Sequence, residues 1–169
     1  SYEAVNLDDA KILLGQGRVP SPSDPLFHAQ MVYSVASLTY AAFRRALGRS
    51  LAWGFESEGE GATKLRLRPF AFEGSNAYYD QDQGSIAFGY FRAQPGKVRR
   101  NLPRGLVFTA LSHDVIAHEV THALLDGLRA EFVVPSNPDV LAFHEGIADL
   151  VAILLHFSYP SLMKAALAE

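Results

Sequence analysis

Apolar residues between positions 25 and 48 recur at three- and four-residue steps, which is the spacing of one face of a helix. Asp24 and Pro25 stand where a helix N-cap and a first-turn proline are expected, and Gly48 is a suitable stop. The pattern therefore predicts a helix of about two dozen residues. Residues 1–23 end in a proline- and serine-rich stretch and are predicted to be an irregular lead-in.

From residue 51 to about residue 110 the apolar residues follow another pattern, in short aromatic or alternating segments separated by turn residues. Such segments predict strands. The alternation is clearest from residue 64 onward, where it gives one apolar face and one polar face. The predicted strands are 51–55, 64–72, 76–79, 86–91 and 106–110, with turns at 56–61 and 80–84.

Beyond residue 110 the chain is again predicted to be helical. One helix is capped by Ser112 or Asp114 and runs to about Gly127. A second begins at Asn137 and Pro138 and reaches about Phe157, and a third starts at Pro160. Because strands and helices are segregated along the sequence, we expect a single α+β domain over residues 1–169.

Composition narrows the chemistry that the chain can use. The net charge of −3 gives no reason to expect nucleic acid or an anionic membrane as a partner. There is no cysteine, so any metal must be held by His, Asp or Glu. The local basic cluster is interpreted as a solvated loop rather than a phosphate site; it comprises Lys97, Arg99, Arg100 and Arg104.

The sequence leaves the cellular compartment open. The first ten residues do not have the pattern of a signal peptide. The longest apolar stretch, 146–157, contains Asp149 and His156 and is too short to span a bilayer. We therefore expect no membrane-spanning segment.

The motif His118-Glu-Val-Thr-His122 indicates a zinc site. Two histidines four residues apart project from the same face of a helix and can bind one cation. Glu119, next to the first histidine, is placed to accept a proton from a metal-bound water. These residues predict a hydrolase with His118 and His122 as ligands and Glu119 as general base.

The next predicted helix offers the third ligand. Glu145 and Asp149 are again four residues apart, and the helix around them is apolar over most of its circumference. Carboxylates in such a helix require partners. We expect Glu145 to bind the metal and Asp149 to accept the free ring N–H of a ligand histidine, His118. Asp126 and His144, beside the two motifs, are further candidates for supporting contacts.

Other kinds of metal site fit the sequence less well. A metzincin would continue the motif with Gly and His, but positions 125 and 128 are both Leu. A dinuclear carboxylate site would need more acidic residues on these helices. His113 could support the site, whereas His28 and His156 are interpreted as ordinary helix residues.

The two helix motifs resemble those of the thermolysin family of gluzincin peptidases. Residues 114–124 are similar to the active-site helix of the family and residues 144–149 to its glutamate helix, and the likeness extends over about residues 25–157. It implies a zincin-like fold with a mixed sheet, and the same roles for His118, His122, Glu145, Glu119 and Asp149. Asn76-Ala-Tyr-Tyr resembles the edge strand of the family, which implies that Asn76 and Ala77 bind an extended peptide substrate.

Departures from the family bear on activity. No tyrosine lies between residues 126 and 143, where the family has one for the transition state, and a C-terminal helical lobe is expected to be absent or truncated. The resemblance matches Asp114 to one calcium ligand of the family, but His156 stands where another calcium-binding carboxylate would be expected, so zinc is expected and calcium is doubtful. The leading hypothesis is a zinc endopeptidase of low activity. The rivals are a zinc-bound but catalytically silent interaction domain and a metal-free helical binding domain.

Overall fold

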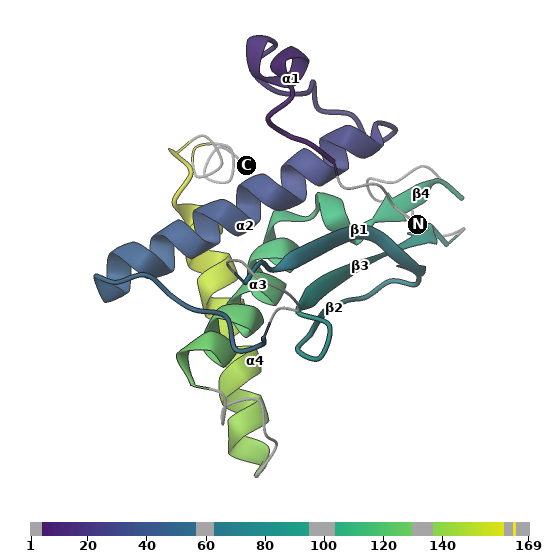
Figure 1. Cartoon of the computed structure of the whole chain (residues 1–169). Coiled ribbons are helices and arrows are strands. Elements are labelled where there is room, and N and C mark those ends of the chain that lie inside the picture. Colours follow the sequence, from purple (N-terminus) through teal and green to yellow (C-terminus); the bar gives the residue numbers. More distant parts are fainter. Residues whose placement is uncertain (1–4, 57–62, 95–103, 130–136, 161–163, 165–169) are drawn as a thin grey trace.

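The structure is a computed structural model that describes residues 5–56, 63–94, 104–129, 137–160 and 164. Helices and strands are combined as an α+β fold, in which a small mixed sheet lies against helices (Figure 1). The elements follow in the order α1 Ala10–Leu14, α2 Pro25–Leu47, β1 Arg66–Glu73, β2 Ala77–Asp80, β3 Ser85–Arg92, β4 Leu106–Phe108, η1 Thr109–Leu111, α3 His113–Leu128 and α4 Pro138–Phe157.

Helix α2 has the boundaries that its end signals predict. Asp24 accepts a hydrogen bond from the Leu26 N–H at 3.0 Å, and Gly48 ends the helix with a φ of 66°, a value that favours glycine. The expectation of an irregular lead-in was wrong in part, because residues 10–14 form the short helix α1. Asp9 caps that helix by accepting a hydrogen bond from Lys11.

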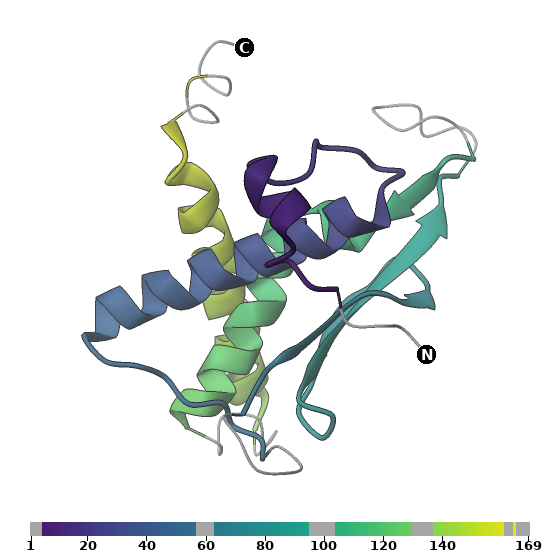
Figure 2. The same cartoon turned by 45° about the horizontal axis from the view of Figure 1, so that its top comes forward.

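The sheet places β3 at its centre. β1 pairs with β3 in parallel, while β2 and β4 pair with it antiparallel. Within the described residues β2 pairs only with β3, so it is an edge strand. α2 and α3 both contact the sheet and each other, and α4 packs along α3 (Figure 2). The core between these layers includes Val32, Ile86, Phe88, Ile116 and Leu124, all fully buried.

The predicted strand at 51–55 was wrong, and a side chain explains why. The hydroxyl of Tyr40 donates to the carbonyl of Leu51 at 3.1 Å and lies 3.3 Å from its N–H. Both backbone groups of Leu51 therefore find their partner on α2 rather than on another strand. Gly54 lies against the carboxylate of Asp126, where a Cβ atom would overlap it. The aromatic residues of this segment pack on other side chains instead: Trp53 lies against both Tyr40 and Phe55.

Other expectations have mixed outcomes. The turn at 80–84 is confirmed, and the strand predicted at 106–110 ends at Phe108 and passes into η1. Most of the turn at 56–61, most of the basic cluster and most of the helix predicted from Pro160 lie outside the described residues.

Helix α4 is the one described helix that is long and apolar enough to cross a membrane, judged by length and composition. The sequence-based expectation counted only residues 146–157, which is a shorter stretch than the full helix. Helices that pack inside soluble proteins can have the same length and composition. In this fold α4 contacts α3 and presents His144, Glu145 and Asp149 among its apolar residues.

Candidate metal centre

Helix α3 brings the two histidines of the motif together. Ser112 caps the helix, and nine of its side chains are buried, so its orientation is determined by the core. The Nε2 atoms of His118 and His122 are 3.0 Å apart, and their ring centroids are 4.7 Å apart. Burial, and next the neighbouring His118, hold the pKa of His122 below its usual value. The His122 ring is therefore neutral at pH 7 and can offer a lone pair to a cation.

Glu145 reaches the same point from α4. Its Oε2 is 3.3 Å from the Nε2 of His118, and its Oε1 is 3.5 Å from the Nε2 of His122. Ligands at about 2.0–2.2 Å in a tetrahedral zinc site are roughly 3.3–3.6 Å apart. Two imidazoles and one carboxylate are also the donors that zinc prefers when no thiolate is available. The two contacts of Glu145 lie in this range of ligand separations, while the 3.0 Å between the two histidine Nε2 atoms is slightly shorter. The three predicted ligands thus converge on a point where a metal ion could bind.

A second layer of contacts orients both histidines. The Nδ1 of His118 is 2.9 Å from the Oδ1 of Asp149, the contact expected from the sequence. The Nδ1 of His122 is 3.2 Å from the Nδ1 of His144, whose ring lies nearly parallel to it. When His122 binds a cation through Nε2, its Nδ1–H can donate to His144. Burial lowers the pKa of His144, which favours the neutral acceptor form that this bond requires.

Glu119 lies beside the ligands in a protected position. It is only 8% exposed, and burial raises the pKa of its carboxyl to about 6. The positive charge that His118 can carry and a backbone hydrogen bond from Tyr79 act in the opposite direction. A carboxyl group with a pKa near neutrality can both accept and release a proton under physiological conditions.

Asp126 has a different role from the one expected. Its carboxylate accepts hydrogen bonds from the Tyr79 hydroxyl at 2.6 Å and from the Gln81 side chain at 3.0 Å. These bonds tie the end of α3 to β2 and the turn after it. Asp126 acts on the centre through its charge, which opposes the lowering of the pKa of His144.

Sequence reasoning missed Tyr79. Burial, and then its hydrogen bond to Asp126, raise the pKa of this phenol above its usual value, so the hydroxyl remains a donor. Its backbone also contacts Glu119. The alternation of β2 was the available signal, because Ala77 and Tyr79 share the face that is less exposed than Tyr78.

Asn76 and Ala77 lie at the start of the edge strand β2, which contacts α3. Ala77 is buried and pairs with Phe88 of β3, while the backbone carbonyl of Asn76 accepts the Gly89 N–H at 2.9 Å. The hydroxyl of Thr109 donates to the carbonyl of Gly89 at 2.9 Å and reinforces this end of the sheet. An edge strand beside the metal centre is therefore present, and its binding of substrate stays a prediction.

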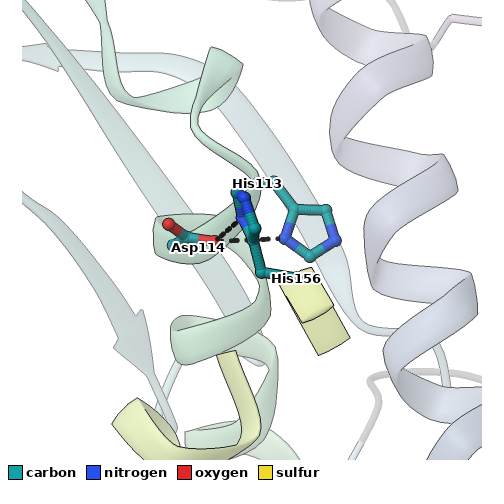
Figure 3. A group of neighbouring side chains, drawn as sticks. All are labelled: His113, Asp114 and His156. Carbon is teal, nitrogen blue, oxygen red and sulfur yellow. Dashed lines mark hydrogen bonds and ion pairs between the residues drawn. The ribbon is translucent and has the colours of Figure 1, made fainter. Parts of the chain in front are cut away.

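A second group of His and Asp residues lies at the other end of the helix pair. It comprises His113 and Asp114 at the start of α3 and His156 in the last turn of α4 (Figure 3). The interpretation of His156 as an ordinary helix residue was wrong, since its Nδ1 is 2.8 Å from the Oδ1 of Asp114.

Comparison with known proteins does not assign the chain to a family. No protein-family model, curated protein sequence or solved structure matches the chain. The class of the protein therefore has to be argued from the residues themselves.

Proposed function

We propose that this chain is a zinc-dependent metallopeptidase domain of the thermolysin-like, gluzincin type. His118, His122 and Glu145 hold the ion, and Glu119 is the general base. The observation that carries the proposal is the approach of Glu145 to both histidines, because the separate helices α3 and α4 bring three metal-ligating groups to one point.

The order of the elements supports the same class. A long helix, a mixed sheet with an antiparallel edge strand, a helix with the His-Glu-x-x-His motif and a helix with the glutamate follow one another along the chain. This is the order that the family resemblance implies for a zincin-like domain. The resemblance is carried by short motifs, so the peptidase activity rests on the centre more than on the fold.

Each residue of the centre has a separate role in the proposed reaction. When bound, zinc polarises the carbonyl that is attacked and makes its water more acidic. Glu119, which is buried beside the ligands, accepts the proton and passes it to the leaving amine. Asp149 fixes the ring of His118 through Nδ1, and His144 fixes that of His122. An extended peptide would lie along β2, near Asn76 and Ala77.

The rival is a zinc-bound domain without catalytic activity. It is motivated by the absence of a tyrosine between residues 126 and 143, the segment where the family places a transition-state donor. Each such donor contributes about 3–4 kcal/mol to lowering the barrier. A peptidase built on this chain is therefore expected to be slow.

The deciding experiment combines elemental analysis with a fluorogenic peptide assay, with and without a chelator. We expect about one zinc at the centre per chain, chelator-sensitive cleavage, and a fall of roughly 100- to 10,000-fold in rate for Glu119→Gln with zinc retained. Glu73→Gln, at the exposed end of β1, is the matched control and should leave the rate unchanged. Full activity in Glu119→Gln would refute its role as base. Zinc without any cleavage would favour the silent domain, and loss of all metal binding would overturn both.

A further inference from the structure

We propose that His113, Asp114 and His156 form a second site for a divalent transition-metal ion, with zinc as the most suitable, at the opposite end of the α3–α4 pair from the candidate catalytic centre. The two helices are antiparallel, so the start of α3 meets the end of α4 at this place. The proposal does not require the chain to be a peptidase, since none of the three residues belongs to the candidate catalytic centre.

The geometry of the cluster converges on a single oxygen atom. The Oδ1 of Asp114 is 2.8 Å from the Nδ1 of His156 and 3.3 Å from the Nδ1 of His113. Figure 3 shows both rings turned toward this carboxylate, and the rings are nearly perpendicular, at 88° with centroids 5.7 Å apart. One donor atom from each residue lies within 4.8 Å of the others. A cation could thus be reached by all three without moving a helix.

The donor types select the kind of ion. Calcium and magnesium prefer shells made almost entirely of oxygen atoms, whereas this cluster offers two imidazole nitrogens and one carboxylate oxygen. That combination suits zinc and its neighbours in the first transition series. Ligands of tetrahedral zinc are roughly 3.3–3.6 Å apart. The 3.3 Å contact between His113 and Asp114 already has this length, while the 2.8 Å contact between Asp114 and His156 must lengthen by about half an ångström. Both side chains are more than a third exposed and have room to adjust.

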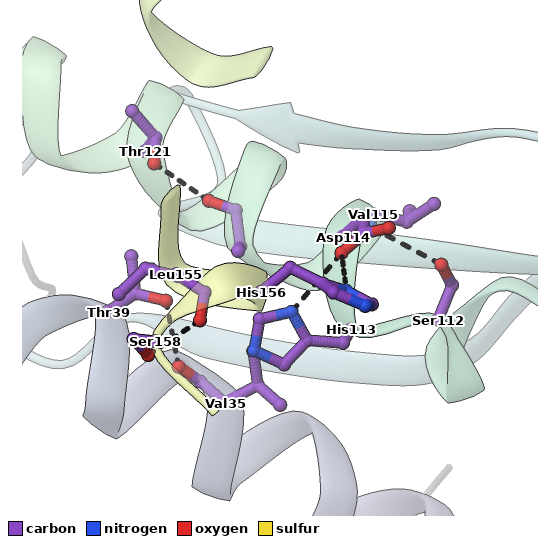
Figure 4. Close-up of polar contacts among 11 residues, drawn as sticks. Val35, Thr39, Ser112, His113, Asp114, Val115, Thr121, Leu155, His156 and Ser158 are labelled. Carbon is purple, nitrogen blue, oxygen red and sulfur yellow. Dashed lines mark hydrogen bonds and ion pairs between the residues drawn. The ribbon is translucent and has the colours of Figure 1, made fainter. Parts of the chain in front are cut away.

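The backbone on both sides is held by caps. Ser112 accepts a hydrogen bond from the Val115 N–H, and the Ser158 hydroxyl donates to the Leu155 carbonyl at 2.6 Å (Figure 4). His113 is 15% exposed and is also packed edge-on against Tyr159. The ligands are therefore carried by fixed backbone, which lowers the entropy lost when an ion binds. Three protein ligands leave one tetrahedral position for water.

A bound ion is expected to stabilise the packing of α4 on α3. An ion here would clamp the end of α4 onto the start of α3, and α4 has few buried side chains of its own to hold it there. The other end of α4 would then present Glu145 to His118 and His122 in a more fixed position. The second site is thus a structural clamp.

The test counts zinc in matched variants of the full chain after removal of loosely bound metal. We expect two zinc ions per natural chain, one in His118→Gln/His122→Gln and one in His113→Gln/His156→Gln. The last variant keeps the catalytic centre, so its remaining ion and activity report on the proposed function separately. The control is Asp139→Asn, an exposed acidic residue in the first turn of α4, which should keep two ions.

Two further measurements identify the ligands. Nitrogen-15 spectra of His118→Gln/His122→Gln should show zinc on Nδ1 of His113 and His156, whereas the catalytic pair uses Nε2 in the other variant. Zinc at about 100 times its Kd should raise the Tm of His118→Gln/His122→Gln by roughly 5–10 °C. The proposal is overturned if this variant folds but binds no zinc, or if its ion survives the addition of His113→Gln/His156→Gln. If the combined variant does not fold, the single variants Asp114→Asn and His156→Gln of the natural chain replace it. Each should reduce the number of zinc ions per chain from two to one, and an unchanged number rejects the site.

Discussion

Helices α3 and α4 supply the two halves of the candidate centre, but they are held in place in different ways. α3 buries nine side chains between α2, the sheet and α4. α4 has the more apolar sequence, yet it buries only His144, Ala148 and Ala152, which follow one another at four-residue steps. Leu150, Ile153 and Leu154 of α4 are at least half exposed. The imidazoles are thus positioned by the core, and the carboxylate by a narrow stripe of contacts.

The small and polar residues of α4 determine how closely and in which register it packs against α3. Two alanines let the helix approach α3 closely, and contacts from Asp149, His144 and His156 fix its register. The hydrophobic effect is non-directional and does not select one register of two packed helices, whereas a hydrogen bond requires a defined distance and angle between its two groups. α3 is therefore held more firmly than α4.

The largest effect is expected from removing the same side chain on the two helices. Leu124 of α3 is fully buried, and Leu154 of α4 is 59% exposed. Leu124→Ala should lower the free energy of unfolding by about 2–5 kcal/mol, and Leu154→Ala by less than about 0.5 kcal/mol. Urea titrations of the metal-free proteins would measure both. A loss above about 1 kcal/mol for Leu154→Ala would mean that the outer face of α4 is covered in solution.

Glycine gives a second matched pair. A Cβ atom on Gly127 of α3 would overlap the backbone carbonyl of Ala52, whereas one on Gly146 of α4 would meet nothing within 4 Å. Gly127→Ala should therefore reduce stability by about 1–3 kcal/mol. Gly146→Ala should increase it by about 0.5–1 kcal/mol, because alanine loses less entropy in a helix. Thermal unfolding followed by circular dichroism would detect opposite signs, and equal signs would contradict the contrast between the helices.

The helix limits and the helix faces that carry the candidate centre could be predicted from the sequence, because their signals are local. The exposure of most of α4 could not. Asp24 and Gly48 set the limits of α2, and Asn137 and Pro138 set the start of α4. The four-residue steps in the two motifs placed their side chains on single helix faces. The approach of Glu145 to the histidines was also expected, although nothing in the local pattern measures the distance between two helices.

What could not be predicted depends on pairs that are distant in sequence. Tyr40 binds the backbone of Leu51, and this removes the strand that the aromatic pattern indicated. Asp114 meets His156 across 42 positions, and Tyr79 meets Asp126 across 47. Each partner has an ordinary local environment, so only the folded chain reveals the contact.

The contact between Asp149 and His118 tests how well the polar stripe of α4 holds the centre. Asp149→Asn keeps the shape but removes the charge that makes the His118 ring a better donor. Zinc affinity should fall by about 10- to 100-fold. Competition with a chromophoric chelator measures this, with Asp139→Asn as a control at an exposed position of the same helix. To keep the second site out of the measurement, both variants are made in the His113→Gln/His156→Gln background. Unchanged affinity would show that His118 is positioned by α3 alone.

The pH dependence of stability depends on the Glu119 carboxyl, whose pKa is raised by its burial on α3. Glu119 has a pKa of about 6 in the folded chain against a usual value of 4.5. The unfolded chain therefore releases this proton at lower pH than the folded chain does. Below about pH 4.5 the group is protonated in both states and has no effect; as the pH rises past 6 the metal-free protein should lose about 2 kcal/mol of stability.

Glu119→Gln should remove this loss, because the amide does not titrate. The comparison is made by urea unfolding of both chelator-treated proteins at pH 4.5 and pH 7, and the same loss in both would show that the buried face of α3 does not disfavour the charge on Glu119.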